Sequence, residues 1–410
     1  MNENIRNKSS WGFAFTIASM WFGTHVGAGF ATGNQVVGYF SKYGGIAPFF
    51  PILAMGILAL VMYVYMKYAK LNGFTNYKDT FRSVYPKPWM EILFEIFYII
   101  IILAAVAGCI TGAAQIMAKI VGETNYGAAG YGAITWTYNL IATAALILLS
   151  IFGLNLIRIV STGLSVAIII TAVIVVIVGF AYGGTIDAVL AAHPEVTLAE
   201  YVNEPVNAPW RGIVIYAAFQ CVSLPSMISG STELSMKGIK RACILGWIMN
   251  GFLLALSAFM LAKWYPLLQG LANAGPEVYG VFALGGVPTA IPNLTILTLT
   301  GLKALYWAYN ILLFCAFVST SVTLVFSMID RFSPIMFPTA IKNEKARGVI
   351  VGAIVLTLCL LIAPLGLTKI TSMLYGYDGY LAVLVIFIPA IIWALPAVKK
   401  LSAAKAAEAE

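Results

Sequence analysis

Charged residues, histidines and catalytic motifs are scarce in this sequence. Asp, Glu, Lys and Arg make up 10% of the 410 residues, and there are two histidines. No HExxH, GxSxG or P-loop motif occurs, so neither hydrolytic catalysis nor ATP-driven transport is indicated. The five cysteines stand singly in apolar stretches without a CxxC pair, which argues against a disulfide framework. We therefore expect a protein that is not an enzyme and that needs no cofactor.

Apolar residues dominate what is present. They make up 61% of the chain, and the mean hydropathy is +0.91. This composition leaves no room for a large soluble domain, and it argues against a nucleic-acid partner despite the net charge of +8. The long apolar runs predict an all-α integral membrane protein with about ten helices that cross the lipid bilayer. The runs cover residues 11–40, 46–66, 92–120, 133–151, 157–182, 211–232, 242–262, 302–329, 348–364 and 370–395.

The basic residues predict how these spans are oriented. If the N-terminus is cytoplasmic, 18 of the 24 Lys and Arg residues fall on the inner side. Such an excess follows the positive-inside rule. Because the number of spans is even, both termini are expected in the cytoplasm.

An internal repeat divides the spans into two halves. A shift of about 199 residues places Trp11 on Trp210 and five apolar runs on the other five. Because five is odd, the second half must enter the membrane from the opposite side, which is the inverted repeat of many secondary transporters. We expect a first repeat at 1–182, an extracellular loop at 183–208, a second repeat at 209–397 and a cytoplasmic tail at 398–410.

Each half contains one span with an interruption. Residues 23–29 read GTHVGAG, with three glycines in the middle of the first span. In the sixth span, Pro225 follows Val222 and Ser223 and cannot donate a backbone hydrogen bond. Two breaks at equivalent positions predict that helices 1 and 6 are unwound around a midplane substrate site. The alternatives are a packing face of small residues and a simple proline kink.

Residues 23–33, GTHVGAGFATG, resemble the first-helix signature of the YkvI-type amino acid permeases. These permeases belong to the APC superfamily, whose members have the leucine-transporter (LeuT) fold. The resemblance covers all ten spans in order and spacing, but its residue motif is confined to the first span and part of the eighth. It implies a LeuT-like 5+5 inverted repeat and a multi-pass protein of a bacterial-type plasma (inner) membrane.

The resemblance also implies a sodium site between the first and eighth spans. In LeuT relatives, two carbonyls of the first-helix break and hydroxyls of the eighth helix bind Na⁺. The matching carbonyls here are those of Gly23 and Val26, and the matching hydroxyls are those of Ser319, Thr320 or Ser321. Neutral oxygens of this kind hold a coupling cation without burying a second charge. The alternative is that these hydroxyls bond back to helix carbonyls one turn earlier.

Backbone groups freed at the two breaks suggest how a substrate binds. Amides at the start of the second half of helix 1 favour a carboxylate. Carbonyls at the break of helix 6 favour an ammonium, so together the two breaks describe a zwitterion site. The candidate substrate-binding residues are Thr24, His25, Ala28, Gly29, Phe30, Phe219, Gln220, Val222 and Ser223.

Three residues are candidates for gating: Asp378, Tyr377 and Trp21. The sequence favours a Na⁺-coupled symporter that moves a small neutral amino acid or related zwitterion by alternating access. One alternative is a proton-coupled transporter that uses His25 or Asp378, because intramembrane ionisable residues are typically functional. Another is a ligand sensor of the same fold that does not transport.

Overall fold

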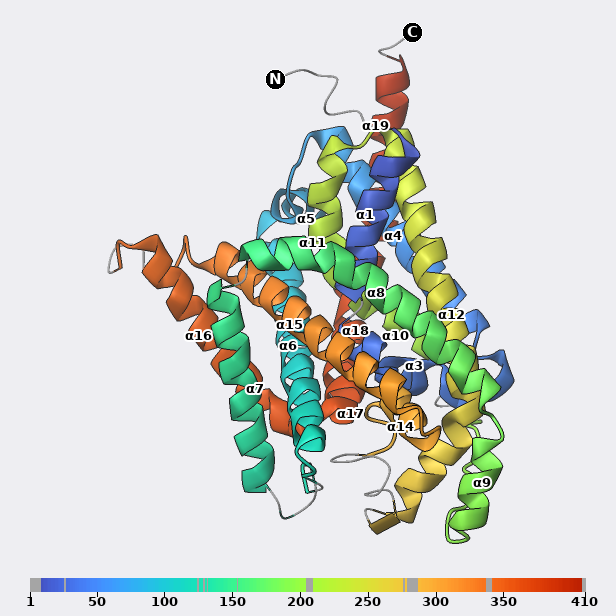
Figure 1. The fold of residues 1–410 in the computed structure, drawn as a ribbon. Coiled ribbons are helices and arrows are strands. Elements are labelled where there is room, and N and C mark those ends of the chain that lie inside the picture. The colour runs from blue at the N-terminus through green and yellow to red at the C-terminus, as the bar shows by residue number, and fades with distance from the viewer. Residues whose placement is uncertain are drawn as a thin grey trace.

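The computed structural model describes residues 9–407, except 26, 124, 128, 129, 131, 153, 204–208, 276, 279–286 and 337–340. The regular elements in these ranges are all helices (Figure 1). Each of the ten predicted spans falls on helical residues. The prediction of an all-α protein is therefore confirmed.

The first half of the chain contains α1 (Trp11–His25), α2 (Ala28–Thr32), α3 (Asn34–Tyr39), η2 (Ser41–Ile46), α4 (Phe49–Asn72), α5 (Tyr77–Val84), α6 (Glu91–Ile120), α7 (Gly132–Phe152), α8 (Leu154–Ala181) and α9 (Thr185–Ala192). The second half begins with α10 (Pro209–Phe219), η5 (Gln220–Ser223), α11 (Leu224–Gly230), α12 (Met236–Ala274), α14 (Pro292–Leu299), α15 (Lys303–Phe332) and α16 (Glu344–Ile362). It ends with α17 (Leu367–Lys369), η8 (Ile370–Tyr375), α18 (Gly376–Ala382), η9 (Val383–Phe387), η10 (Ala390–Ala394) and α19 (Leu395–Ala407).

The long helices have the length and composition of membrane spans. Within the described residues, seven helices are long and apolar enough to cross a bilayer, or eight if the pair bent by 62° between α8 and α9 forms one span. Many of their large apolar side chains are exposed, which suits a surface that faces lipid rather than water. The chain is therefore a multi-pass membrane protein.

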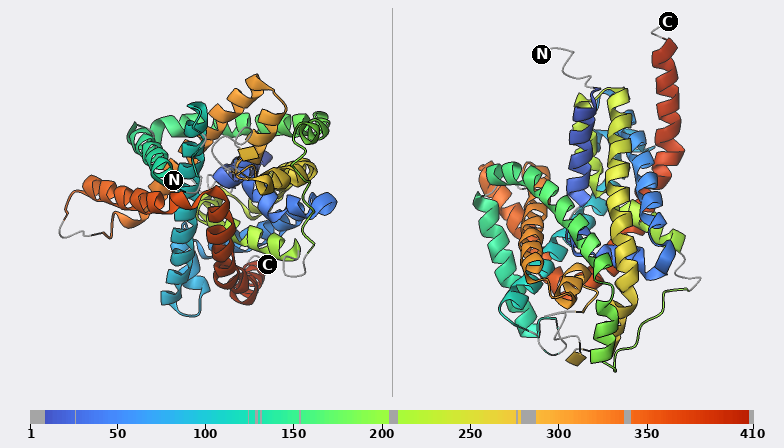
Figure 2. Two further views of the ribbon diagram at one scale, coloured as in Figure 1. Left: turned by 90° about the horizontal axis from the view of Figure 1, so that it is seen from below. Right: turned by 45° about the vertical axis from the view of Figure 1, so that its right-hand side comes forward.

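The long helices pack side by side around one continuous apolar core. Helix α12 lies along α1 and α4, and α15 lies along α6 and α16. In Figure 1, α7 and α16 lie at one edge of the molecule and α12 at the opposite edge. Helix α1 begins and α19 ends at the same end of the molecule (Figures 1 and 2). This arrangement agrees with termini on one side, whereas their cytoplasmic location stays a prediction.

The predicted C-terminal tail is partly helical. Helix α19 continues the last span to Ala407. Alanine has the highest helix propensity, so the alanine-rich residues 403–407 extend the helix beyond the apolar run. The ammonium of Lys405 donates to the carbonyl of Leu71, at a distance of 3.0 Å, and this bond ties the tail to α4.

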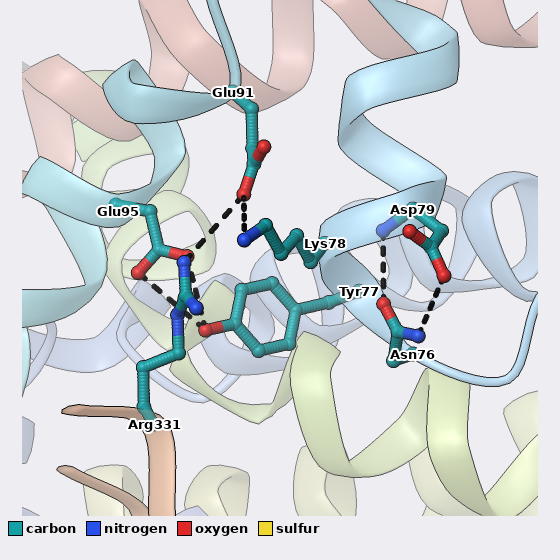
Figure 3. A network of polar contacts seen from close by, with 7 residues as sticks. All are labelled: Asn76, Tyr77, Lys78, Asp79, Glu91, Glu95 and Arg331. Carbon is teal, nitrogen blue, oxygen red and sulfur yellow. Dashed lines mark hydrogen bonds and ion pairs between the residues drawn. The ribbon is translucent and has the colours of Figure 1, made fainter. Parts of the chain in front are cut away.

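A network of charged side chains joins α5, α6 and α15 (Figure 3). The Arg331 guanidinium donates from Nη2 and Nε to Glu95 Oε1, at 2.6 and 2.8 Å. The hydroxyl of Tyr77 donates to the same carboxylate at 3.3 Å, and Glu91 lies 3.7 Å from Arg331 and 4.0 Å from Lys78. Burial, and then the charge of Glu95, raise the pKa of the Tyr77 hydroxyl, so this hydroxyl remains a donor at neutral pH.

Candidate functional site

The first span is interrupted where its glycines predicted. Helix α1 ends at His25 and α2 begins at Ala28, and Gly27 between them is extended, with φ −95° and ψ −166°. The amide of Gly27 donates to the His25 carbonyl at 2.8 Å, so it does not form the bond to Gly23 that a continuous helix would contain. Val26 lies outside the described residues, and the roles of its carbonyl and of the Gly23 carbonyl in ion binding stay predictions.

A second interruption of the same span was not predicted. Gly33 separates α2 from α3 and has a positive φ of 84°. A side chain at this position would meet Asn293, Leu261 and Pro292, each at 3.0 Å. Glycine is therefore required here both by the backbone conformation and by close packing.

The sixth span changes its winding at the predicted residues. Between α10 and α11, residues Gln220–Ser223 form the 3₁₀ segment η5. The amide of Leu224 donates to the carbonyl of Cys221, whereas Pro225 has no amide hydrogen for the α-helical bond to that carbonyl. The segment is therefore wound more tightly rather than unwound, which differs from the prediction.

The His25 side chain joins the two interruptions. Its Nε2 lies 3.2 Å from Ser223 Oγ and 3.3 Å from the Gln220 carbonyl oxygen. The indole N–H of Trp21 donates to the same Nε2 at 2.9 Å, and His25 is buried. The predicted substrate residues His25, Gln220 and Ser223 therefore lie together, although they are about 195 positions apart in the chain.

The predicted hydroxyl cluster of α15 lies beside the first interruption. A Cβ atom added to Gly27 would lie 3.4 Å from Thr320 Cγ2. The hydroxyl of Ser321 is buried and has no hydrogen-bond partner among the described residues. Buried hydroxyls are normally paired, so Ser321 Oγ is an available oxygen ligand in the helix whose Thr320 lies against the break.

The other predicted substrate residues have different surroundings. Phe30 is buried and packs edge-on against Phe22, and the backbone of Gly29 packs closely against the Gln35 side chain. The Thr24 hydroxyl donates to the Met20 carbonyl, one turn earlier in the helix, at 2.9 Å. This bond occupies the hydroxyl within its own helix and is the alternative to a contact with substrate. The amide of Ala28 opens α2, whereas Val222 is only partly buried within η5.

Phe219 belongs to a cluster of aromatic side chains. Its ring centroid lies 5.0 Å from that of Tyr216, 5.1 Å from that of Tyr375 and 5.3 Å from that of Tyr39. Aromatic pairs at such separations attract one another beyond the gain from burial. The cluster joins α3, α10 and η8, and Phe219 immediately precedes the 3₁₀ segment η5 in the chain.

A cavity of about 510 Å³ lies on the side of this cluster that the charge pattern assigns to the outside. Among the predicted gating residues, Tyr377 lines the cavity and is 70% exposed. Asp378 and Trp21 do not line it, and both are buried. The cavity is lined by Asn34, Val37, Gly38, Tyr39, Lys42, Tyr43, Arg211, Gly212, Ile215, Tyr265, Gln269, Thr289, Thr368, Thr371, Ser372, Met373, Gly376, Tyr377 and Tyr380.

Two basic side chains give the cavity a positive potential. Arg211 donates to the Tyr380 hydroxyl, and the Lys42 ammonium lies 5.1 Å from the centroid of the Tyr43 ring. Burial, and then the charge of Arg211, lower the pKa of Lys42. A cleft with one sign of charge raises the local concentration of ligands with the opposite sign, here carboxylates.

Several polar residues form hydrogen bonds with the outer half of the first span. No pattern in the sequence identified them. The hydroxyl of Tyr309 and the amide of Asn293 both donate to the carbonyl of Ala31. The side chain of Asn34 donates to the Thr289 carbonyl at 2.9 Å. These residues stand singly in the sequence, without a motif, so their convergence depends on the fold.

No family model matches the chain, and a search of curated proteins also finds no match. Solved structures do match. The chain is similar to MhsT in complex with L-phenylalanine, with 15% identity, a TM-score of 0.55 and coverage of 97% of this chain and 96% of MhsT. It is also similar to the inward-facing conformation of Mhp1, with 15% identity, a TM-score of 0.57 and coverage of 95% and 79%.

A third structure supports the same assignment. The manganese transporter of Eremococcus coleocola, as its mutant E129A, has 12% identity, a TM-score of 0.54 and coverage of 93% of this chain and 78% of the transporter. Identities this low establish only that the folds are alike. Together with the helix order, the three likenesses show that the chain has the LeuT-like membrane fold predicted from its sequence.

Proposed function

We propose that this protein is a secondary active transporter that couples Na⁺ to the movement of a small neutral amino acid or related zwitterion. The proposal rests on the arrangement of residues around His25. The break of α1 and the 3₁₀ segment η5 meet at His25, which contacts Gln220 and Ser223, and Thr320 of α15 lies against the break at Gly27. Breaks of this kind in a membrane helix persist where they serve a substrate or ion pathway.

The cation site consists of the α1 break and the α15 hydroxyls. Ser321 Oγ supplies an unpaired, buried oxygen, and Thr320 lies against the break at Gly27. Backbone carbonyls around residues 23–26 complete the ligand set in this proposal. Hard, neutral oxygens suit Na⁺, because a second buried charge would cost free energy in the membrane.

The substrate site lies between the two interruptions. The amides of Ala28, Gly29 and Phe30 form the first turn of α2 and therefore have no acceptor within that helix. Because α2 has only five residues, direct amide hydrogen bonds rather than a helix dipole hold the carboxylate. The 3₁₀ carbonyls of η5 receive the ammonium, and the aromatic cluster around Phe219 separates the site from the outer cavity.

Uptake into proteoliposomes tests this function. Each common amino acid, radiolabelled, is offered with an inward gradient of NaCl or of choline chloride. The proposal predicts Na⁺-dependent accumulation of a class of neutral amino acids. Ser321→Ala should lose the Na⁺ dependence, whereas Thr323→Ala should keep it, because Thr323 is exposed and bonds back to the Ser319 carbonyl.

Two other results would change the proposal. If Ser321→Ala kept full Na⁺ dependence, the assigned cation site would be rejected. Saturable binding without accumulation in the wild-type protein would instead indicate a sensor of the same fold.

A further inference from the structure

Asp378 is an acidic side chain buried in the middle of the last span. It lies in α18 and is 2% exposed. Neither Oδ1 nor Oδ2 has a hydrogen-bond partner among the described residues. Burying an ionised carboxylate without a partner is so unfavourable that such a group is normally neutralised instead. The carboxyl must therefore be neutralised.

The surroundings of Asp378 identify what neutralises it. Helix α18 packs against α10, α6, η8 and η9. The titratable side chains grouped around Asp378 and its neighbour Tyr375 are Tyr39, Tyr216, Cys221 and Cys109. Thiols and phenols are ordinarily neutral at pH 7. Arg211 of α10 contacts α18 at the Tyr380 hydroxyl, on the cavity side. Among the described residues, no Lys, Arg or His forms a hydrogen bond with the Asp378 carboxyl.

A metal ion is a poor fit to the same surroundings. Hard cations such as Na⁺ and Ca²⁺ need several oxygen ligands. The described residues contain no cluster of three or more His, Cys, Asp and Glu side chains that could hold a metal. A proton needs only one carboxyl oxygen, so it is the ligand that this site accommodates.

The carboxyl lies close to water on one side. Gly376, Tyr377 and Tyr380 belong to the same short helix and line the outer cavity. Since a helix with its side chains is about 10–12 Å across, Asp378 lies within roughly that distance of the cavity. The π-helical turns η8 and η9 flank α18, and such turns are frequent at functional sites.

Helix α18 is also in close contact with the sixth span. A Cβ atom on Gly379 would lie 2.6 Å from Ile215 Cγ2 and 2.9 Å from the Ile215 carbonyl oxygen, so the two backbones touch. Helix α10 continues directly into the 3₁₀ segment η5. A movement of α10 therefore changes the environment of Asp378.

We propose that Asp378 is a proton-binding site, loaded from the outer cavity, that links protonation to the position of α10. A proton from water adds to one carboxyl oxygen and returns to water when α10 moves. Its coupling to transport rests on the proposed function, but the presence of the bound proton does not. The site is separate from the cation site at α15, so this proton is additional to Na⁺.

Infrared spectroscopy detects the bound proton directly. The full-length protein in lipid nanodiscs is titrated from neutral to alkaline pH, and the C=O stretching band of a protonated carboxylic acid is followed. The proposal predicts a band at neutral pH that is lost at alkaline pH. The band should be absent in Asp378→Asn and present in Asp187→Asn, a control at an exposed acid of α9.

Two infrared results would overturn the proposal. One is the absence of the band in the wild-type protein, and the other is an unchanged band in Asp378→Asn. If the Asn variant does not fold, Asp378→Glu replaces it. An unshifted band in Asp378→Glu would also overturn the proposal. No substrate is needed, so this test stands even if no amino acid is transported.

A transport assay then tests the coupling. With an amino acid that the uptake panel identifies, an inward proton gradient should increase accumulation by the wild-type protein but not by Asp378→Asn. Exchange of labelled for unlabelled amino acid needs no net proton movement and should persist in the variant. A response to the gradient equal to that of the wild type would reject the coupling role.

Discussion

The contact of α1 with α12 supports a quantitative prediction. A Cβ atom on Gly246 of α12 would lie 2.0 Å from Cε3 and 2.5 Å from Cζ3 of the Trp21 ring. Trp21 is fully buried, so the ring has no free space to move into. The same indole donates to His25, so a displaced ring also moves His25 away from η5. Gly246→Ala is therefore expected to damage both packing and the candidate site.

The loss of folding free energy in Gly246→Ala can be estimated by comparison with Gly251→Ala on the same helix. There the nearest atoms to a new Cβ lie 3.6 Å away, which is ordinary contact. Both variants gain up to about 1 kcal/mol of helix propensity, which cancels in the comparison. Overpacking costs about 1–3 kcal/mol, so Gly246→Ala should be less stable than Gly251→Ala by about that amount.

Thermal unfolding of the purified variants measures this difference. Gly251→Ala should melt at or above the wild-type temperature, and Gly246→Ala below that of Gly251→Ala. Equal melting temperatures for the two variants would refute the packing of Trp21 on Gly246 and, with it, the positioning of His25.

Three further predictions follow from other contacts. Trp21→Phe removes the 2.9 Å bond to His25 and should cost about 1 kcal/mol of stability and weaken amino acid binding, measured by thermal shift. Glu95→Gln removes the nearer of the two carboxylates beside the partly buried Arg331. It should lower the free energy of unfolding by about 1–3 kcal/mol, between the values for surface and buried ion pairs, as measured by unfolding experiments. Burial lowers the pKa of Lys42 in the folded state, so the unfolded state binds more protons and stability rises as pH increases toward the unfolded pKa. Lys42→Met should reduce that rise in pH-dependent melting curves.

The first interruption illustrates what the sequence reveals about this fold. Three glycines within residues 23–29 lower the helix propensity locally, and the break is found there. The break at Gly33 was missed, because it depends on close contacts with Asn293 and Leu261, which are distant in the chain. Local composition predicts where helix propensity is low, whereas tertiary contacts decide at which of these positions the helix is interrupted.

The sixth span illustrates a different limit. Pro225 marks the position of the change, because its missing amide is a local property. Whether the chain unwinds or tightens depends on what pairs with the freed carbonyls. Ser223 Oγ donates to the Gln220 carbonyl at 2.8 Å, and His25 lies beside the same carbonyl. The bond from Ser223 favours the compact 3₁₀ form, and the neighbouring His25 comes from the other half of the chain.

The outer cavity and Asp378 depend most on the fold. Residues from five separate parts of the chain line the cavity, so no local pattern could predict it. Asp378 stands out in the sequence as an acid within an apolar span. That its carboxyl has no hydrogen-bond partner among the described residues is visible only in the structure.

The central claim is that cation and substrate bind together where the two interruptions meet α15. The most direct measurement is the thermal stabilisation of the purified protein by a panel of amino acids, each in NaCl and in choline chloride, with Na⁺ also titrated with and without the best amino acid. We expect Na⁺ and one class of amino acid to raise each other's affinity by the same factor, because binding linkage is reciprocal. Equal stabilisation by amino acids in both salts would contradict the shared site.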